Sequence, residues 1–434
     1  MNNNIIIKTE DHPSTEELIS LMQKDDLGKN KDIEGILRML KLTKSNNGIR
    51  IISLDGPWGS GKTYTVKQIE TLLSSKEDLS ETVKHINKDL IKESQDAFVP
   101  CYYNAWENDY ASNPTQSLLL NLNDYLIEKS IIERSETQLL NAIKGLAANT
   151  LQKATGLNEE MIEHGKTTAK LTEEVNKNKK LRITISNAIS KLSELHNKKV
   201  LYIIDDIDRC KPTYAVELLE SIKHCFDNEK VVFLVATNIT ELSNIINGYY
   251  GGKLDGSLYL DRIIDLRIGL NTIDIEHYVK SKIIEPNQSI APILVAKYLN
   301  MTMREMNRYL SIINLYSDFI NNSHISIRDE ARNNCIKHLF LPLFLGYKIK
   351  NNNAFSILTR GNGFNYIQSY IESSDEIKAY TAGLLSPNSF KEYQIEAIKT
   401  IYNSLINEPK TSYQSLTATS FWEIINLTSR MISF

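Results

Sequence analysis

The stretch Leu54 to Thr65, LDGPWGSGKTYT, surrounds one lysine and one threonine with glycines. It fits the pattern G-x-x-x-x-G-K-S/T, in which a loop with few side chains lets backbone N–H groups point at phosphate oxygens. In this pattern the lysine neutralises the outer phosphates and the hydroxyl ligates Mg²⁺. A chance match is the alternative, but an apolar run precedes the loop and a helical stretch follows it. The sequence therefore predicts a phosphate-binding loop made of Gly56, Pro57, Trp58, Gly59, Ser60, Gly61, Lys62, Thr63 and Tyr64.

A second set of candidate residues follows the apolar run at 201–204, in LYIIDDIDR. A buried strand would carry Asp205 to its tip, where the carboxylate would hold Mg²⁺ through water, together with Thr63. Asp206 is placed to orient or deprotonate an attacking water, and Asp208 is the weaker candidate for that role. The alternative is an acidic helix cap after a strand, because Asp is a common N-cap residue.

Two other apolar runs also end in polar residues. VVFLVATN ends at Asn238, which would lie at the carboxyl end of a strand, where ligands of open α/β sheets bind. Asn238 is predicted to position the attacking water, unless it only forms the turn after the strand. The run at 98–103 leads into NAWENDY, in which Trp106 is expected to pack and Glu107 either faces the nucleotide or is a solvated loop acid.

These residues need a scaffold that brings the ends of several strands together. Short apolar runs lie at residues 49–54, 98–103, 201–204 and 231–236, and residues 259–268 indicate a helix end that leads into another strand. Stretches of helical periodicity separate these runs. The alternation predicts an α/β fold with a parallel sheet covered by helices on both faces.

The rest of the chain is expected to be helical. Residues 117–196 are charged, lack proline and repeat apolar residues at three- and four-residue spacing. They predict a helical insertion that packs as a hairpin, wraps a partner or dimerises. Residues beyond 270 are helical in pattern almost to the end. Residues 1–48 are interpreted as a polar N-terminal arm with one helical stretch.

The composition is that of a soluble protein. The chain has 434 residues, of which 41% are apolar and 24% charged, and this length predicts two or three domains. A net charge of −3 gives no electrostatic footprint for nucleic acid. No apolar run reaches the roughly 18 residues of a membrane helix, and the best candidate, which starts at His338, contains a proline. Without a zinc-type spacing, the four cysteines are expected to be reduced thiols of a cytoplasmic protein; they are Cys101, Cys210, Cys225 and Cys335.

Several stretches, taken together, resemble the KAP family of P-loop NTPases, in the STAND branch of the additional-strand ATPases. They are LDGPWGSGKT, YYNAWEND, LYIIDDIDRCKP, VVFLVATN, YLDRIIDLRIGL and TMREMNRYL, and they cover about residues 49–310. The phosphate loop alone is generic, whereas its tryptophan, the N-A-W motif and the D-D-I-D-R-C run are more specific. The resemblance implies ATP, Mg²⁺ and a strand order of 5-1-4-3-2. It also implies an NTPase domain at 49–270 and a helical lid at 271–350, whereas residues 351–434 are interpreted from their own aromatic residues as a C-terminal helical domain.

The resemblance further implies roles for three arginines. Arg262 matches a basic position that reaches a γ-phosphate in cis or across a subunit interface, as in a nucleotide-linked homo-oligomer. Arg304 and Arg308 are four residues apart, hence on one helical face, and match a lid sensor that contacts nucleotide. A surface arginine and a solvated helix stripe are the respective alternatives.

The function implied by the resemblance is that of an ATP-hydrolysing switch with a partner effector, in bacterial defence against phage. Many members carry transmembrane helices between the phosphate loop and the acidic strand. The insertion of this chain is polar at that place, so attachment to a membrane is not expected. Two other functions stay open: a DNA-acting ATPase, such as a loader or translocase, and a nucleotide-dependent scaffold with negligible hydrolysis.

Overall fold

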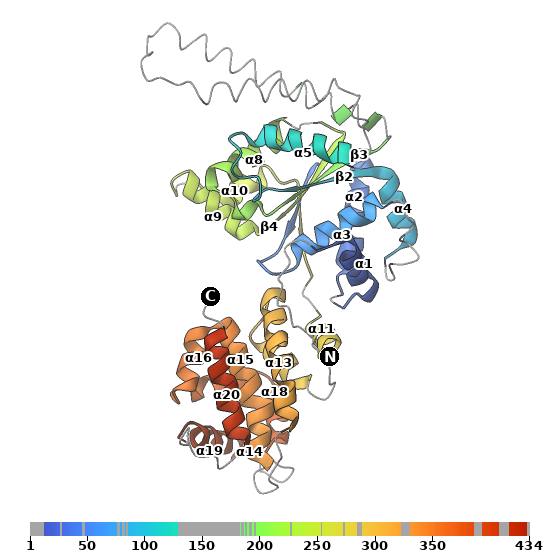
Figure 1. Cartoon of the computed structure of the whole chain (residues 1–434). Coiled ribbons are helices and arrows are strands. Elements are labelled where there is room, and N and C mark those ends of the chain that lie inside the picture. The colour runs from blue at the N-terminus through green and yellow to red at the C-terminus, as the bar shows by residue number, and fades with distance from the viewer. Residues whose placement is uncertain are drawn as a thin grey trace. The chain divides into compact units, whose positions relative to one another are not determined.

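The computed structural model describes residues 13–128 and 197–431 apart from short gaps, together with single positions between 183 and 194. The chain divides into two compact units, one spanning His12–Thr272 and the other consisting mainly of Ile273–Phe434 (Figure 1). The first unit contains a sheet, and the described part of the second is helical. Most of the insertion predicted at 117–196 lies outside the described residues.

Five parallel strands form the sheet of the first unit in the order β2-β3-β4-β1-β5. This is the predicted order 5-1-4-3-2 read from the other edge, and the predicted α/β class is confirmed. The first four strands begin and end within two residues of the ends of the apolar runs that predicted them, and the fifth lies at the end of the stretch 259–268. The strands are β1 (Ile51–Asp55), β2 (Phe98–Asn104), β3 (Lys199–Asp205), β4 (Val231–Thr237) and β5 (Leu266–Gly269).

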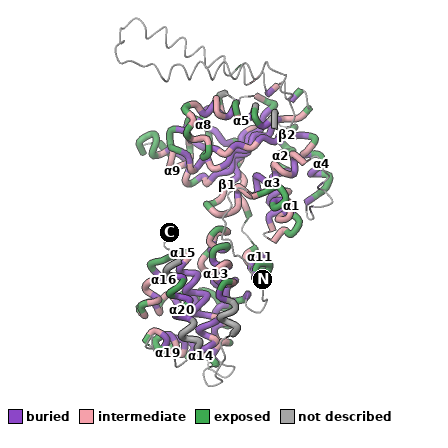
Figure 2. The backbone as a smooth tube through the Cα atoms, in the orientation of Figure 1, coloured by how far each residue is buried: buried purple, intermediate pink, exposed green. Residues whose placement is uncertain are grey.

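Helices cover both faces of this sheet, because alternate residues of each strand point to opposite faces. Val200, Tyr202 and Ile204 of β3 belong to one buried core, and Leu201 and Ile203 belong to the other. Figure 2 shows the strands as the buried centre of the unit. The helices of the unit are α1 (Thr15–Lys24), α2 (Asn30–Ser45), α3 (Lys62–Ser74), α4 (Lys88–Ala97), α5 (Pro114–Glu128), α8 (Pro212–Cys225), α9 (Ile239–Tyr249) and α10 (Gly256–Asp261).

The segment interpreted as an N-terminal arm contributes to this unit. Ile33, Leu37 and Leu40 of α2 are fully buried, in the same core as Val66 and Ile69 of α3. Their three- and four-residue spacing gives α2 one apolar side, and that side packs on the helix that follows the phosphate loop. In the described structure α2 is therefore part of the sheet-containing unit.

The second unit is built from helices. The apolar run that starts at His338 lies in a π-helical segment (Ile336–Phe340) and in the helix α15 (Leu341–Lys350), and its residues from Leu339 onward are buried. None of the described helices is long and apolar enough to cross a membrane. The helices are α11 (Ile275–Lys282), α12 (Ile290–Tyr298), α13 (Met303–Asn322), α14 (Glu330–Cys335), α15 (Leu341–Lys350), α16 (Asn352–Thr359), α17 (Phe364–Glu372), α18 (Asp375–Gly383), α19 (Gln394–Asn407) and α20 (Leu416–Met431).

The structure describes the side chains of three of the four cysteines. Cys101, Cys210 and Cys335 are buried free thiols. Burial raises the pKa of Cys335 to about 12, so this thiol is protonated at neutral pH. The side chain of Cys225 lies outside the described residues.

Candidate functional site

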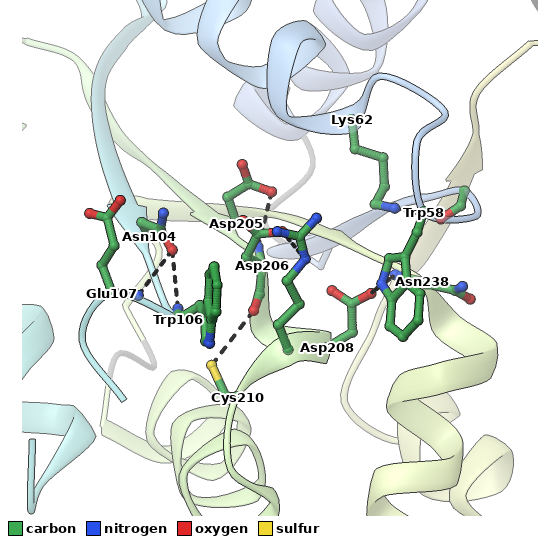
Figure 3. Close-up of polar contacts among 12 residues, drawn as sticks. Trp58, Lys62, Asn104, Trp106, Glu107, Asp205, Asp206, Asp208, Cys210 and Asn238 are labelled. Atoms are coloured by element: carbon green, nitrogen blue, oxygen red, sulfur yellow. Dashed lines mark hydrogen bonds and ion pairs between the residues drawn. The ribbon is translucent and has the colours of Figure 1, made fainter. Parts of the chain in front are cut away.

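Three loops meet at the carboxyl edge of the sheet, because β3, β4 and β1 are neighbours. β1 ends at Asp55 and leads into the predicted phosphate loop, β3 ends at Asp205, and β4 ends at Thr237. Asp55 and Thr237 are register partners in the ladder between β1 and β4. Parallel strands whose ends meet in this way form the ligand-binding edge of open α/β sheets. Figure 3 shows the side chains that gather at this edge.

The loop between β1 and α3 has the backbone that phosphate binding requires. Gly61 has a φ of 93° and is the N-cap of α3, a left-handed conformation that favours glycine. A Cβ at Gly61 would have no heavy atom within 4 Å, so the loop leaves open space beside the first turn of α3. A Cβ at Gly56 would lie 2.6 Å from Ser60 Oγ. The left-handed backbone thus explains the glycine at position 61, and the N–H groups at the start of α3 can meet an anion.

Lys62 is the first residue of α3, and its side chain folds back into the loop. Its Nζ donates hydrogen bonds to the carbonyl oxygens of Gly56, at 2.6 Å, and of Pro57, at 3.2 Å. Burial lowers the pKa of Lys62 below its ordinary value, while the carboxylates of Asp208 and Asp205 act in the opposite direction. The ammonium group therefore lies inside the loop, among carbonyls that a phosphate could replace.

Thr63, at the start of α3, and Asp205, at the end of β3, lie together at this edge. Asp205 is completely buried, and its carboxylate accepts hydrogen bonds from Tyr102 Oη at 3.0 Å and from the Asp206 N–H at 3.0 Å, while the nearby Thr63 hydroxyl acts to lower its pKa. Burial, and next the charge of Asp206, raise the pKa of Asp205 to about 6. A hydroxyl beside a buried carboxylate with an acidic neighbour is a donor set that suits Mg²⁺.

Two buried hydroxyl groups beside the loop also fit a phosphate ligand. Ser60 Oγ and Thr237 Oγ1 are buried, and neither has a hydrogen-bond partner in the part of the chain that the structure describes. Buried hydroxyls are normally satisfied, since an unpaired one costs free energy. Together with the open space at Gly61, these hydroxyls support the fit between this edge and a phosphate-bearing ligand.

Asp206, the candidate base, is held by an ion pair. Its Oδ1 lies 3.1 Å from Nε of Arg209, and the guanidinium of Arg209 lies over the ring of Trp106, 5.7 Å from the ring centroid. Asp206 has a φ of 57°, a left-handed conformation that Asp adopts more readily than most residues. The ion pair and the stacked tryptophan therefore fix the direction of the Asp206 carboxylate.

Asp208 is buried, and its surroundings differ from those of Asp206. Its Oδ2 accepts a hydrogen bond from Nε1 of Trp58, at 2.7 Å, and another from the backbone N–H of Asn238, at 3.1 Å (Figure 3). Asp208 thus contacts the phosphate loop and the turn after β4 at once. Whether it also takes part in catalysis remains a prediction.

Asn238 is the N-cap of α9. Its side-chain oxygen accepts hydrogen bonds from the N–H groups of Thr240 and Glu241, as the turn alternative predicted. Only its amide nitrogen is left for a contact with water or phosphate. The sensing role of Asn238 stays a prediction that rests on that nitrogen.

Comparison with known proteins identifies the family. The sequence model of the KAP family P-loop domain matches residues 31–318. The chain belongs to the KAP family. The match begins within α2 and ends within α13. A nucleotide-binding fold at this edge is what the family provides.

Other comparisons add little to the family assignment. No curated protein matches the chain. The structure of C. elegans PCH-2 is among the similar solved structures, with 12% sequence identity, a TM-score of 0.26, and coverage of 89% of this chain and 72% of that chain. With so low a TM-score and sequence identity, the similarity to PCH-2 supports no conclusion about function.

Two of the three arginines expected from the KAP resemblance belong to the second unit. Arg262 is exposed at the end of α10, and within the described residues its guanidinium has no partner in the loop. Arg304 and Arg308 are exposed on α13, in the second unit. Their predicted contact with nucleotide stays a prediction.

Tyr102 was not expected at this KAP site, and Asn104 was expected only as part of the N-A-W motif, without a role of its own. Tyr102 donates to Asp205 across the β2–β3 ladder, and Asn104 Oδ1 accepts the N–H groups of Trp106 and Glu107. The signal for Asn104 was available, because an Asn after an apolar run often orders the turn that follows. Tyr102 gave no local signal, since only the strand register places it beside Asp205.

Proposed function

We propose that this KAP-family chain binds ATP with Mg²⁺ and hydrolyses it, and that the nucleotide state acts as a switch. One observation carries the proposal: the ammonium group of Lys62 and the Thr63–Asp205 pair lie at one sheet edge, beside a left-handed glycine loop. A cation, a metal-type donor pair and the backbone N–H groups at the start of a helix are parts that phosphoryl transfer uses.

Each part has a definite task. Lys62 would exchange its carbonyl partners for phosphate oxygens and neutralise their charge. Thr63 and Asp205 would hold Mg²⁺, which screens the charge of the phosphates when it is bound. The Asp206 carboxylate, fixed by Arg209, would orient or deprotonate the attacking water. The amide nitrogen of Asn238 would hold the same water from the turn after β4.

A single hydroxyl group tests this assignment. Thr63→Val keeps the shape of the side chain and removes the hydroxyl that lies beside Asp205. We expect this variant to lose most of the Mg²⁺-dependent release of phosphate from ATP. Thr71→Val, on the same helix and away from the loop, is the matched control and should keep wild-type turnover. Phosphate release is measured with and without a chelator of divalent cations.

Equal turnover of the two variants would contradict the placement of Mg²⁺ at Thr63 and Asp205. Turnover of the wild type that persists in the chelator would contradict the role of Mg²⁺ itself. Because both threonines are β-branched like valine, differences in helix propensity do not confuse the comparison.

A nucleotide-dependent scaffold with negligible hydrolysis is the second candidate. The observation that favours it is the ion pair between Asp206 and Arg209, since a paired carboxylate is a weaker base than a free one. The two candidates differ in one measurement. A scaffold binds ATP and ADP with different affinities yet releases no phosphate under single-turnover conditions.

The setting of the switch rests on the family resemblance. In the proposed account the protein acts in defence against phage with an effector partner, and Arg262, exposed at the end of α10, serves an interface between two copies. Cells that carry the gene with its neighbours should resist phage, and the Lys62→Ala variant should abolish that resistance. Light scattering with ATP and with ADP tests whether the nucleotide changes the size of the assembly.

A further inference from the structure

One carboxylate oxygen joins the three loops of the site. Oδ2 of Asp208 accepts both the Nε1–H of Trp58, at 2.7 Å, and the backbone N–H of Asn238, at 3.1 Å (Figure 3). Asp208 lies in the single helical turn Ile207–Arg209 after β3. Because β4 lies between β3 and β1 in the sheet, Asp208 reaches past the end of β4 to a residue of the loop after β1.

The exposure of the two side chains shows what holds this contact together. Trp58 is 48% exposed, so burial of its ring accounts for only part of its placement. Asp208 is 4% exposed, and a carboxylate removed from water needs its hydrogen bonds. Hydrogen bonds to an ionised group are about twice as strong as neutral ones. The indole N–H of Trp58 is therefore the group that ties the phosphate loop to Asp208.

The same geometry gives Oδ2 of Asp208 a positioning role. Oδ2 already accepts two N–H donors, and the side chain is more deeply buried than that of Asp206, which is 15% exposed. A base must reach a water molecule with a lone pair that is not already used. Oδ2 of Asp208 is thus occupied by its two N–H donors.

We infer that Trp58 and Asp208 are positioning residues that form a clasp, which holds the phosphate loop against the turn after β4 in the shape that binds nucleotide. This inference rests on the proposed function, since it assigns the clasp to the same site. A loop that is already held in its binding shape loses less conformational freedom when the ligand binds. Breaking the clasp should then weaken binding of nucleotide, whereas removal of a base would slow turnover and leave binding intact.

Four variants separate the two roles. Trp58→Phe keeps an aromatic ring and removes the N–H donor, and Asp208→Ala removes the acceptor. Each should raise the Kd for ATP–Mg²⁺ by about tenfold to a hundredfold, the range of one hydrogen bond to a charged group. Asp208→Asn keeps an oxygen that can accept both hydrogen bonds, so the rise should be smaller. The double variant Trp58→Phe with Asp208→Ala should be no worse than Asp208→Ala alone.

The control is Tyr249→Phe, which changes an aromatic residue of similar exposure, 41%, on α9 of the same unit. Its Kd should equal that of the wild type. Loss of turnover in both Asp208→Asn and Asp208→Ala, with the wild-type Kd, would show a base and overturn the clasp. If Asp208→Ala does not fold, Trp58→Phe decides alone, and a Kd equal to that of the wild type overturns the inference.

The clasp can be tested even if the proposed function fails. Should the wild type bind no ATP, the same four variants are compared by the free energy of unfolding in denaturant without nucleotide. A clasp predicts that the effects of Trp58→Phe and Asp208→Ala do not add, because both remove the same contact. Additive effects would overturn the clasp, whereas failure of ATP binding alone would overturn only the proposed function.

Discussion

Replacing Asp206 by asparagine removes the candidate base with little disturbance of the backbone. The φ of 57° at this position is one that Asn adopts about as readily as Asp, whereas alanine would add strain of about 1–2 kcal/mol. The amide oxygen can still accept a hydrogen bond from Arg209. The partly exposed ion pair contributes at most about 1 kcal/mol, so the free energy of unfolding should change little.

The expected effect of Asp206→Asn on turnover is much larger than its effect on the free energy of unfolding. Loss of a positioned base costs about 10²–10⁴ in rate, and we expect the turnover of Asp206→Asn to fall by at least the lower figure. The Kd for ATP–Mg²⁺ should stay near that of the wild type, because Lys62, Thr63 and Asp205 are unchanged. A fall in kcat without a rise in Kd is the pattern of a group that acts in the transition state.

Single-turnover phosphate release measures this rate, and calorimetry measures the Kd. Asp261→Asn is the matched control, since the Asp261 carboxylate is also paired with an arginine, 2.6 Å from Nη2 of Arg267. This control should keep wild-type turnover. The reasoning is refuted if Asp206→Asn turns over like the wild type, or if its Kd rises by as much as its kcat falls.

Two other predictions concern the loop and the predicted lid. Gly61→Ala should lose affinity for ATP–Mg²⁺ and about 1–2 kcal/mol of folding free energy, because φ is 93° at this position; unchanged calorimetry and denaturant unfolding would contradict the argument. Arg304→Ala and Arg308→Ala should leave the Kd for ADP unchanged, and at least one should raise the Kd for ATP by about tenfold to a hundredfold. If both keep the wild-type ratio of the two affinities, these arginines form a solvated stripe.

The phosphate loop and its scaffold could be predicted because their signals are local. Gly56, Gly61, Lys62 and Thr63 stand at fixed spacing, and buried parallel strands appear as short apolar runs. The order of the strands is not a local property, and it came from the family resemblance. The observed strand ends differ by one or two residues from the ends of the apolar runs, as expected where the last residues of a strand are polar.

The connections within the site could not be predicted, because they depend on register and backbone conformation. The hydrogen bond from Tyr102 to Asp205 exists only because Asn104 is the register partner of Asp205. The pairing of Asp206 with Arg209 needs the left-handed backbone at Asp206. Both depend on neighbouring strands and turns, which the order of residues alone does not reveal.

The most direct test of the central claim is the affinity for ATP–Mg²⁺ when the cation of the loop is removed. Lys62→Ala deletes the ammonium group that donates to the carbonyls of Gly56 and Pro57, and Lys92→Ala, which removes an exposed lysine of α4, is the control. In calorimetry the wild type and Lys92→Ala should bind ATP–Mg²⁺ equally, and Lys62→Ala should show no measurable binding although it folds. Wild-type affinity in Lys62→Ala would contradict the account.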